Sequence, residues 1–271
     1  MTQLNERREI VLEVSGLSVS YDRPILRDVN ITIRDVVGRG QVVALLAPSG
    51  TGKTQLFNCI AGLQQPSSGL VRILAGKELV PVQAGMVGVV PQNSLLFEDR
   101  TVYANLMTAA LLKGGSRKEA RTRILELLEL FGMNDAALQY PQQISGGQRQ
   151  RASIIQQMLC NSRFLLMDEP FASLDLLKKI EVYHQIEKIA LRDELNTIIV
   201  TTHDIESAVT IADTVLLLGH DHDAGGNIVP GARIQKEFDL IECGLAWHPE
   251  VATLPMFFDK VNEIKAWFPR L

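Results

Sequence analysis

The segment that most restricts the fold of this chain is residues 47–54, Ala-Pro-Ser-Gly-Thr-Gly-Lys-Thr, taken with its flanks. Residues 41–47 form a short, mostly apolar run, which is typical of a strand buried on both faces of a sheet. Residues 54–63, after the glycines, have a helical pattern. The order of strand, glycine-rich turn and helix predicts an α/β protein whose sheet and helices share one core.

The glycine-rich turn fits the phosphate-binding loop called Walker A, with Ala47 where the first glycine usually stands. Backbone N–H groups of residues 50–53 at a helix N-terminus would hold a β-phosphate. The Lys53 ammonium would reach the β- and γ-phosphates, and the Thr54 hydroxyl would ligate Mg²⁺. The alternative is a glycine-rich turn with a chance lysine, which the flanking strand and helix disfavour. The predicted nucleotide-binding residues of this loop are Ser49, Gly50, Thr51, Gly52, Lys53 and Thr54.

A second pattern, in residues 164–170, is four apolar residues followed by Asp168, Glu169 and a proline. It fits a Walker B strand, because acidic side chains at a strand end face a ligand crevice in α/β proteins. Asp168 would hold Mg²⁺, and Glu169 would orient and polarise an attacking water. A solvated acidic loop after a core strand is the alternative, which the Walker A loop makes much weaker.

The third pattern, residues 144–151, reads Ile-Ser-Gly-Gly-Gln-Arg-Gln-Arg and stands ahead of the Walker B segment. It resembles the signature of the ATP-binding-cassette (ABC) transporter ATPases, with Ile144 replacing the usual leucine. A serine hydroxyl and glycine amides at a helix start can grip a γ-phosphate. In the family, that phosphate belongs to ATP on the opposite subunit. A flexible Gly-Gly turn before an arginine-rich helix is the alternative. The resemblance marks Ser145, Gly146, Gly147 and Gln148 as ATP contacts.

Four further positions match family elements in the family's order. Tyr21 matches the aromatic residue that stacks on adenine, and Gln92 matches the Q-loop glutamine, which contacts Mg²⁺ where a permease docks. Residues 172–175, Ala-Ser-Leu-Asp, match the D-loop, whose Asp175 would cross a dimer interface. His203 matches the switch histidine at the γ-phosphate. Taken singly, Tyr21 would be a packed tyrosine, Gln92 a polar turn residue and His203 an exposed loop histidine.

Patterns outside these motifs predict the rest of the architecture. Residues 10–19 alternate apolar and polar side chains, and residues 31–33 show the same alternation. This pattern predicts strands at an antiparallel edge of the sheet. Residues 164–167 and 197–202 predict further buried strands of a mostly parallel sheet. Residues 101–140 lack strand signals, and an i, i+3, i+4, i+7 stripe of Ile124, Leu127, Leu128 and Phe131 predicts helices there.

The resemblance and these patterns together predict one fold: an α/β P-loop NTPase core, with a mostly parallel sheet and N-terminal antiparallel strands, and an inserted helical subdomain. The predicted nucleotide-binding domain is 10–271. Its catalytic core is about 10–96 and 152–240, its helical subdomain about 97–151, and its C-terminal extension about 227–271. Residues Phe257, Val261, Ile264 and Phe268 predict a helix packed on the protein's own body, with a partner contact or a membrane surface as alternatives.

Composition excludes several other classes. Lysine and arginine number 27 against 31 acidic residues, a formal charge of -4, so no polyanionic partner such as DNA or RNA is expected. The longest apolar blocks, residues 42–47 and 215–218, are too short to cross a bilayer, and residues 1–9 lack the apolar segment of a secretory signal.

The three cysteines lie far from one another in the sequence, which argues for reduced thiols. In residues 220–223, His-Asp-His-Asp beside two glycines predicts a hairpin tip, with a metal site as the alternative.

The resemblance implies an ATPase with ATP and Mg²⁺ that forms a dimer with a second ABC ATPase subunit and energises import through an integral membrane permease, together with a solute-binding protein. It is closest to the group that imports nitrate, sulfonates, taurine or bicarbonate, at the cytoplasmic face of the inner or plasma membrane. Three alternatives stay open: a soluble ABC ATPase acting on ribosomes or nucleic acid, an exporter or lipid-transport ATPase, and a nucleotide-gated regulatory subunit. The solute, the direction of transport, and homodimer against heterodimer also stay open.

Overall fold

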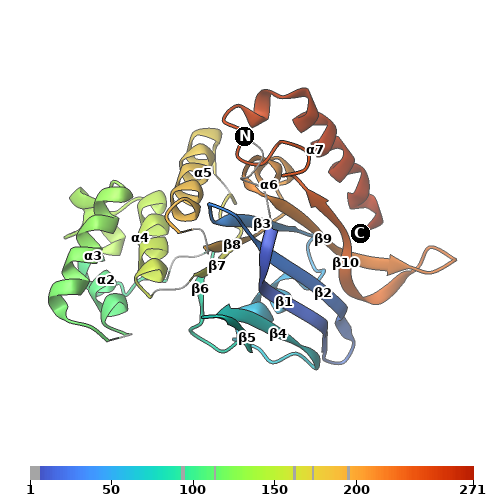
Figure 1. Cartoon of the computed structure of the whole chain (residues 1–271), viewed down its shortest axis with the longest axis horizontal. Coiled ribbons are helices and arrows are strands. Elements are labelled where there is room, and N and C mark those ends of the chain that lie inside the picture. Colours follow the sequence, from blue (N-terminus) through green and yellow to red (C-terminus); the bar gives the residue numbers. More distant parts are fainter. Residues whose placement is uncertain (1–6, 93–94, 113, 161–162, 173, 194–195) are drawn as a thin grey trace.

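The computed structural model describes residues 7–92, 95–112, 114–160, 163–172, 174–193 and 196–271. Its elements in chain order (Figure 1) are β1 (Arg7–Ser20), β2 (Pro24–Val36), β3 (Gln41–Leu46), α1 (Lys53–Ile60), β4 (Ser68–Ala75), β5 (Glu78–Pro81), β6 (Val87–Val90), α2 (Val102–Leu111), α3 (Arg117–Leu130), α4 (Gly146–Leu159), β7 (Phe164–Asp168), α5 (Leu176–Ala190), β8 (Thr197–Thr202), α6 (Ile205–Ile211), β9 (Thr214–His222), β10 (Ile228–Asp239) and α7 (Pro255–Trp267).

The strands form one curled sheet in the order β5-β4-β1-β2-β10-β9-β3-β8-β7-β6. The segment β9-β3-β8-β7-β6 is parallel throughout. At the other end, β1 pairs antiparallel with both β2 and β4, and β4 pairs antiparallel with β5. The predicted fold class, a parallel core with N-terminal antiparallel strands, is therefore confirmed.

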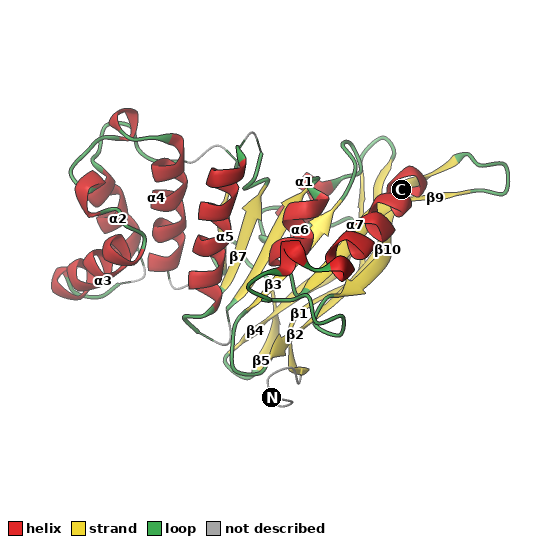
Figure 2. Ribbon diagram, turned by 90° about the horizontal axis from the view of Figure 1, so that it is seen from above, coloured by secondary structure: helices red, strands yellow, loops and turns green. Residues whose placement is uncertain are grey.

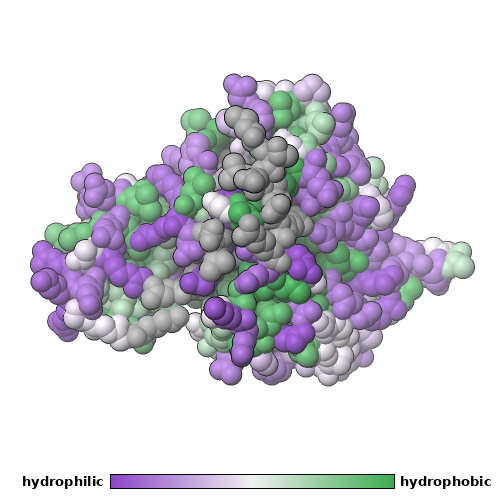
Figure 3. Space-filling model, viewed as in Figure 1, coloured by the Kyte–Doolittle hydropathy of each residue, from purple (hydrophilic) through white to green (hydrophobic). Residues whose placement is uncertain are grey.

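Alternate residues of β3 divide the core between the two faces of the parallel sheet, because successive side chains of a strand point to opposite faces. Val43 and Leu45 pack with α1 and the antiparallel strands. Val42 packs with α2 to α5, whereas Ala44 and Leu46 pack with α6 and α7. The parallel sheet thus lies between α1 with the curled antiparallel strands on one face and helices α2 to α7 on the other. Figure 2 shows α5, α6 and α7 over this second face. On the face drawn in Figure 3, apolar side chains gather over β1, β2 and β4.

Helices α2, α3 and α4 form a group beside the sheet, to the left in Figure 1. The predicted stripe of Ile124, Leu127, Leu128 and Phe131 is buried there, in one cluster with core residues such as Val42. Helix α4 runs unbroken through residue 151, where the predicted subdomain boundary falls, and the Val89 N–H donates to Gln157 on this helix at 3.3 Å. The division into core, helical subdomain and extension stays a prediction.

The C-terminal part packs on the body of the protein. Phe257, Val261 and Ile264 of α7 are buried against α6 and β9, as the stripe predicts. Strands β9 and β10 form a hairpin whose tip is closed by a hydrogen bond from the Asp223 N–H to the Asn227 carbonyl, 2.9 Å, which confirms the predicted hairpin. Asp221 next to the tip pairs with Arg27 and Arg233.

Two features concern the environment of the chain. In the part of the chain that the structure describes, no helix is both long and apolar enough to cross a membrane. Cys59, Cys160 and Cys243 are thiols and not disulfide-bonded, as predicted, but only Cys59 is fully buried. Burial raises the pKa of the Cys59 thiol to about 11, so this thiol stays protonated and unreactive.

Candidate functional site

The carboxyl ends of four parallel strands meet at one edge of the sheet. The register pairs Leu46 of β3 with Thr202 of β8, and Asp168 of β7 with Thr201 of β8. Val90 of β6 pairs with Met167 of β7. The phosphate loop, His203, the Asp168-Glu169 pair and Gln92 follow these strands directly, so the topology gathers them at the edge where α/β proteins bind ligands.

The phosphate loop is held tightly on its inner side. Gly52 has φ +91°, and a Cβ there would approach the Ile25 side chain to 2.8 Å, so only glycine fits this position. The Thr51 hydroxyl donates to the Pro48 carbonyl at 2.8 Å. Ala47 is completely buried among β3, α1 and β2, so its methyl group adds to the core and leaves the loop open.

The outer side of the loop suits an anion. Helix α1 begins at Lys53 with no side chain capping its first N–H groups, so those donors are available to a ligand. Ser49, Gly50 and Thr54 are exposed, and a Cβ at Gly50 would meet nothing within 4 Å. The loop therefore provides uncapped amides, an ammonium and a hydroxyl around one opening, which matches the triphosphate of ATP.

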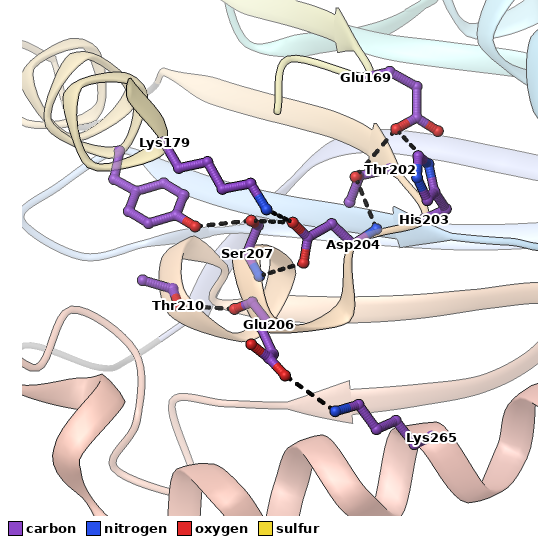
Figure 4. A network of polar contacts seen from close by, with 10 residues as sticks. Glu169, Lys179, Thr202, His203, Asp204, Glu206, Ser207, Thr210 and Lys265 are labelled. Atoms are coloured by element: carbon purple, nitrogen blue, oxygen red, sulfur yellow. Dashed lines mark hydrogen bonds and ion pairs between the residues drawn. The ribbon is translucent and has the colours of Figure 1, made fainter. Parts of the chain in front are cut away.

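Three site residues predicted from the sequence, Lys53, Glu169 and His203, lie in direct contact, and Figure 4 draws the contact of Glu169 with His203. The Glu169 carboxylate lies between Lys53 and His203, with Lys53 Nζ 2.5 Å from Oε1 and His203 Nδ1 2.9 Å from Oε2. The Thr202 hydroxyl donates to Oε2 at 3.2 Å. His203 is 65% exposed, whereas Lys53 and Glu169 are largely buried. The carboxylate is thus held by three groups, an ammonium, an imidazole and a hydroxyl, at the mouth of the loop.

The ionisation and backbone of Glu169 are both unusual. Burial alone would raise the pKa of this carboxyl, but hydrogen bonds from Lys53 and His203 outweigh it and hold the pKa below its usual range. Its φ is +48°, in the left-handed region that costs a side chain about 1–3 kcal/mol, and its N–H donates to the Thr201 carbonyl at 2.9 Å. Backbone strain of this kind is common at functional sites, which supports the assignment of Glu169 as the residue that orients the attacking water.

The predicted metal ligands offer oxygen atoms, which Mg²⁺ prefers. The Thr201 hydroxyl donates to Asp168 Oδ1 at 2.6 Å, which fixes the orientation of this carboxylate. Gln92 is exposed and lines, with Asp168 and Glu169, a hollow of about 590 Å³. Thr54 lies on the first turn of α1. The residue types fit a magnesium site that the nucleotide phosphates would complete.

The predicted signature residues line the same hollow. Ser145 caps α4: its Oγ accepts from the Gln148 N–H at 3.3 Å, and its own N–H donates to Gln148 Oε1 at 2.9 Å. A Cβ at Gly146 or Gly147 would meet nothing within 4 Å, so this turn presents an open surface. The side chain of Gln150, farther along α4, donates to the Pro170 carbonyl at 3.1 Å. The hollow is lined by Ser145 to Gln148, Asp168 and Glu169, but none of its described lining residues belongs to the phosphate loop.

Residues 172–175, which match the D-loop, directly precede α5. Asp175 caps this helix, accepting from the Lys178 N–H at 3.0 Å. Hydrogen bonds from Lys178 lower the pKa of this exposed carboxyl. Ser173 of the same match lies outside the described residues.

Tyr21 lies in the turn between β1 and β2, four residues before Ile25, whose side chain lies close to Gly52 of the phosphate loop. Tyr21 is 64% exposed, and its hydroxyl accepts from the Gln64 amide at 3.0 Å. An exposed ring fixed at its hydroxyl end is suited to stacking on a flat base.

The sequence did not identify the polar network that extends from Glu169 and His203 into α5 and α6 (Figure 4). Asp204 caps α6, pairs with Lys179 of α5, and accepts from the Ser207 hydroxyl at 2.7 Å. The Asp204 N–H donates to Thr202 Oγ1 at 3.1 Å. An aspartate ahead of a helical pattern is a capping signal, so the cap was predictable, whereas its pairing with Lys179 was not.

A family profile described as ABC transporter matches residues 26–172. The sulfate/thiosulfate import ATP-binding protein CysA of Synechococcus elongatus is 35% identical over 217 residues, 79% of this chain and 61% of that protein. The spermidine/putrescine import ATP-binding protein PotA of Spiroplasma citri is 36% identical over 212 residues, 77% of this chain and 59% of that protein. The chain thus spans about 60% of the length of these curated relatives.

A relative of more similar length is the taurine import ATP-binding protein TauB of Yersinia pestis, 37% identical over 214 residues, 77% of this chain and 79% of that protein. Among solved structures, a dimeric ATP-binding cassette bound to ADP and Pi matches with a TM-score of 0.67 and 24% identity, covering 84% of this chain and 98% of that one. The structural match supports the fold.

Proposed function

Because this chain belongs to the ABC transporter family, we propose that it is the ATP-hydrolysing subunit of an importer and drives a separate membrane permease. The observation that carries the proposal is the position of Glu169, held between Lys53 of the phosphate loop and His203 after β8. That arrangement places a carboxylate, kept charged by its low pKa, next to the group that would bind the transferred phosphate.

In the proposed reaction, the loop amides and Lys53 bind the β- and γ-phosphates, and Glu169 accepts a hydrogen bond from the water that attacks the γ-phosphate. His203, exposed beside Glu169, donates to a γ-phosphate oxygen. Mg²⁺, held by Thr54, Asp168 and Gln92, would neutralise phosphate charge. The products are ADP and phosphate.

The proposed working unit is a dimer with a second ABC ATPase subunit. The signature residues Ser145, Gly146 and Gly147 form an open turn on a hollow that the phosphate loop does not line, so their own Lys53 is not their expected partner. The taurine and sulfate relatives are named import ATP-binding proteins, and the fold relative is described as a dimeric cassette. A Ser145 turn that closes over ATP on the partner subunit accounts for these features.

The proposed permease docks near Gln92, between the sheet edge and α4, and a solute-binding protein supplies the solute. The chain would then work at the cytoplasmic face of the membrane, attached through the permease. We propose a small anion as solute, such as nitrate, a sulfonate or bicarbonate, supported by the relatives named for sulfate/thiosulfate and taurine. The relative named for spermidine/putrescine has similar identity, so the permease must decide the solute.

Two measurements test the proposal. The first identifies the partner that copurifies with the tagged chain from membranes of its source, and the second measures phosphate release from ATP in the presence of Mg²⁺. A polytopic permease and a Lys53-dependent release of phosphate are expected. Copurification with ribosomes or nucleic acid would instead assign the chain to the non-transport ABC ATPases, and a permease without any ATP hydrolysis would assign a regulatory role. Transport assays in vesicles then separate import from export.

A further inference from the structure

A cleft of about 840 Å³ lies away from the candidate ATP site, between α5, α6 and residues 247–258 of the C-terminal part. Its lining includes the buried side chains Ile186, Ile211, Val251 and Phe257. Its volume and apolar lining are those of a site for a small organic ligand, which typically fills a pocket of about 300–1,000 Å³.

The charged side chains that line the cleft are acidic, although Arg39 stacks on Trp247 and Lys265 pairs with Glu206 beside it. Three exposed glutamates, Glu187, Glu206 and Glu250, line it, and the described lining residues include no lysine or arginine. Glu206 pairs with Lys265 of α7 at 3.0 Å and Glu187 lies 3.4 Å from His184, whereas Glu250 forms no ion pair with a described residue. Apolar walls with carboxylates at the opening complement a ligand that is apolar and positively charged.

One wall of the cleft is fixed in a strained conformation. Trp247 has φ +60°, which is unfavourable for a bulky side chain. Its indole N–H donates to the fully buried Asp213 at 2.9 Å, and the Arg39 guanidinium lies 4.7 Å from its ring centre. These contacts hold the indole in place, so the cleft has a rigid aromatic wall in addition to Tyr183 and Phe257.

A hydrogen-bonded path leads from the cleft to the candidate ATP site. The Tyr183 hydroxyl, in the lining, lies 2.8 Å from Ser207 Oγ, which is bonded to Asp204. Asp204 bonds to Thr202, which contacts Glu169 (Figure 4). A ligand that moved the Tyr183 ring would therefore act on the cap of α6, directly after His203.

We propose that the cleft between α5, α6 and residues 247–258 binds an apolar organic cation. Binding of this cation changes the position of His203 through the hydrogen bonds of Tyr183, Ser207 and Asp204. Aromatic walls attract a cation by their π-electrons, and the glutamates add Coulombic attraction. The site regulates the proposed ATPase and takes no part in its chemistry.

Two ions of nearly equal size and opposite charge provide the test: tetraphenylphosphonium and tetraphenylborate, each titrated into the full chain by calorimetry. The phosphonium should bind at least about tenfold more tightly than the borate. Equal affinities, or no binding of the phosphonium, would overturn the proposal. So would sedimentation showing that a second copy of the chain covers the cleft and excludes the phosphonium.

Two substitutions on α5 locate the site. Ile180→Lys, at a lining residue that is 38% exposed, puts a cation into the cleft and should abolish phosphonium binding. Leu177→Lys, on the same helix but outside the described lining and 75% exposed, should leave it unchanged. Equal effects of the two substitutions would contradict this location.

Tyr183→Phe tests the path, because it keeps the ring and removes the hydroxyl that contacts Ser207. This variant should bind the phosphonium normally, while the change that the phosphonium causes in ATP hydrolysis should be lost. An unchanged response in Tyr183→Phe would exclude this path. This arm rests on the proposed ATPase function, whereas the binding measurements do not, so the two can fail separately.

Discussion

The Lys53 ammonium and the Glu169 carboxylate form an ion pair of 2.5 Å between Nζ and Oε1, although 116 residues separate them in the sequence. The pair joins the phosphate loop to the end of β7. A phosphate bound in the loop would compete with Glu169 for the Lys53 ammonium. Binding of ATP would therefore free one carboxylate oxygen to face the attacking water, which links nucleotide binding to assembly of the catalytic group.

Glu169→Gln should keep ATP binding and lose hydrolysis. The amide cannot accept a proton, so phosphate release should fall about 10²-fold or more. Lys53 is also released from its ion pair, so ATP affinity should be retained and the ATP-bound dimer should accumulate. Phosphate release and light scattering measure the two effects, with Glu126→Gln on the exposed surface of α3 as control. Hydrolysis near the normal rate would exclude Glu169 from its assigned role.

Lys53→Ala should weaken ATP binding itself. Removal of one charge-assisted contact to phosphate costs about 1.5–3 kcal/mol, which corresponds to roughly a 10- to 150-fold higher Kd. Calorimetric titration with ATP measures the change, and Lys77→Ala in the exposed turn after β4 is the matched control. Unchanged affinity in Lys53→Ala would count against the loop as the ATP site.

A pair of substitutions at Ser145 separates the helix cap from phosphate recognition. Asparagine and aspartate both cap helices about as well as serine, so Ser145→Asn and Ser145→Asp should unfold at nearly the same denaturant concentration as the unchanged chain. Aspartate adds a negative charge where the partner's γ-phosphate would lie, so Ser145→Asp should abolish ATP-dependent dimers far more completely than Ser145→Asn. Equal dimerisation of the two variants would contradict phosphate contact at Ser145.

Asp204 should stabilise the fold in a pH-dependent way. Burial would raise the pKa of its carboxyl, but hydrogen bonds from Lys179 and Ser207 outweigh it and hold the pKa below the usual value. The charged group therefore contributes stability that is fully present above about pH 3.9, the unfolded value, and is lost as the pH falls through the lower folded value. Asp204→Asn, which keeps the helix cap, should cost about 1 kcal/mol at pH 7.

Urea unfolding of the unchanged chain and Asp204→Asn from pH 7 down to about pH 3 measures this effect. The difference between the two should shrink only below about pH 4. A difference that stays constant over this range would show that the charge of Asp204 makes no contribution.

Much of the architecture could be predicted from the sequence because its signals are local. The apolar run before Ala47 and the glycines after it predicted β3 and the loop, and the stripe around Leu127 predicted the buried face of α3. The expected helix over residues 54–63 is shorter than predicted: α1 ends at Ile60, since Gly62 with φ +70° ends the turn.

Features that depend on distant residues could not be predicted. Strands β4 and β6 pair with β1 and β7, which lie far away in the sequence, and β5 has only four residues, paired to the edge of β4. The ion pair of Lys179 with Asp204 joins two helices that only the tertiary fold brings together. The separation of the signature turn from the phosphate loop also depends on how α4 packs beside the sheet, which no local pattern encodes.

The most direct test of the account is a cross-link between two copies of the chain. In a Glu169→Gln background without the natural cysteines, one copy carries Ser49→Cys in the phosphate loop and the other carries Arg149→Cys on the first turn of α4. With ATP and a short bismaleimide, the account predicts covalent dimers of mixed composition that disappear without ATP. Two results together would contradict the shared site. The mixture would give no mixed dimers with ATP, and a single copy carrying both cysteines would give only intramolecular links.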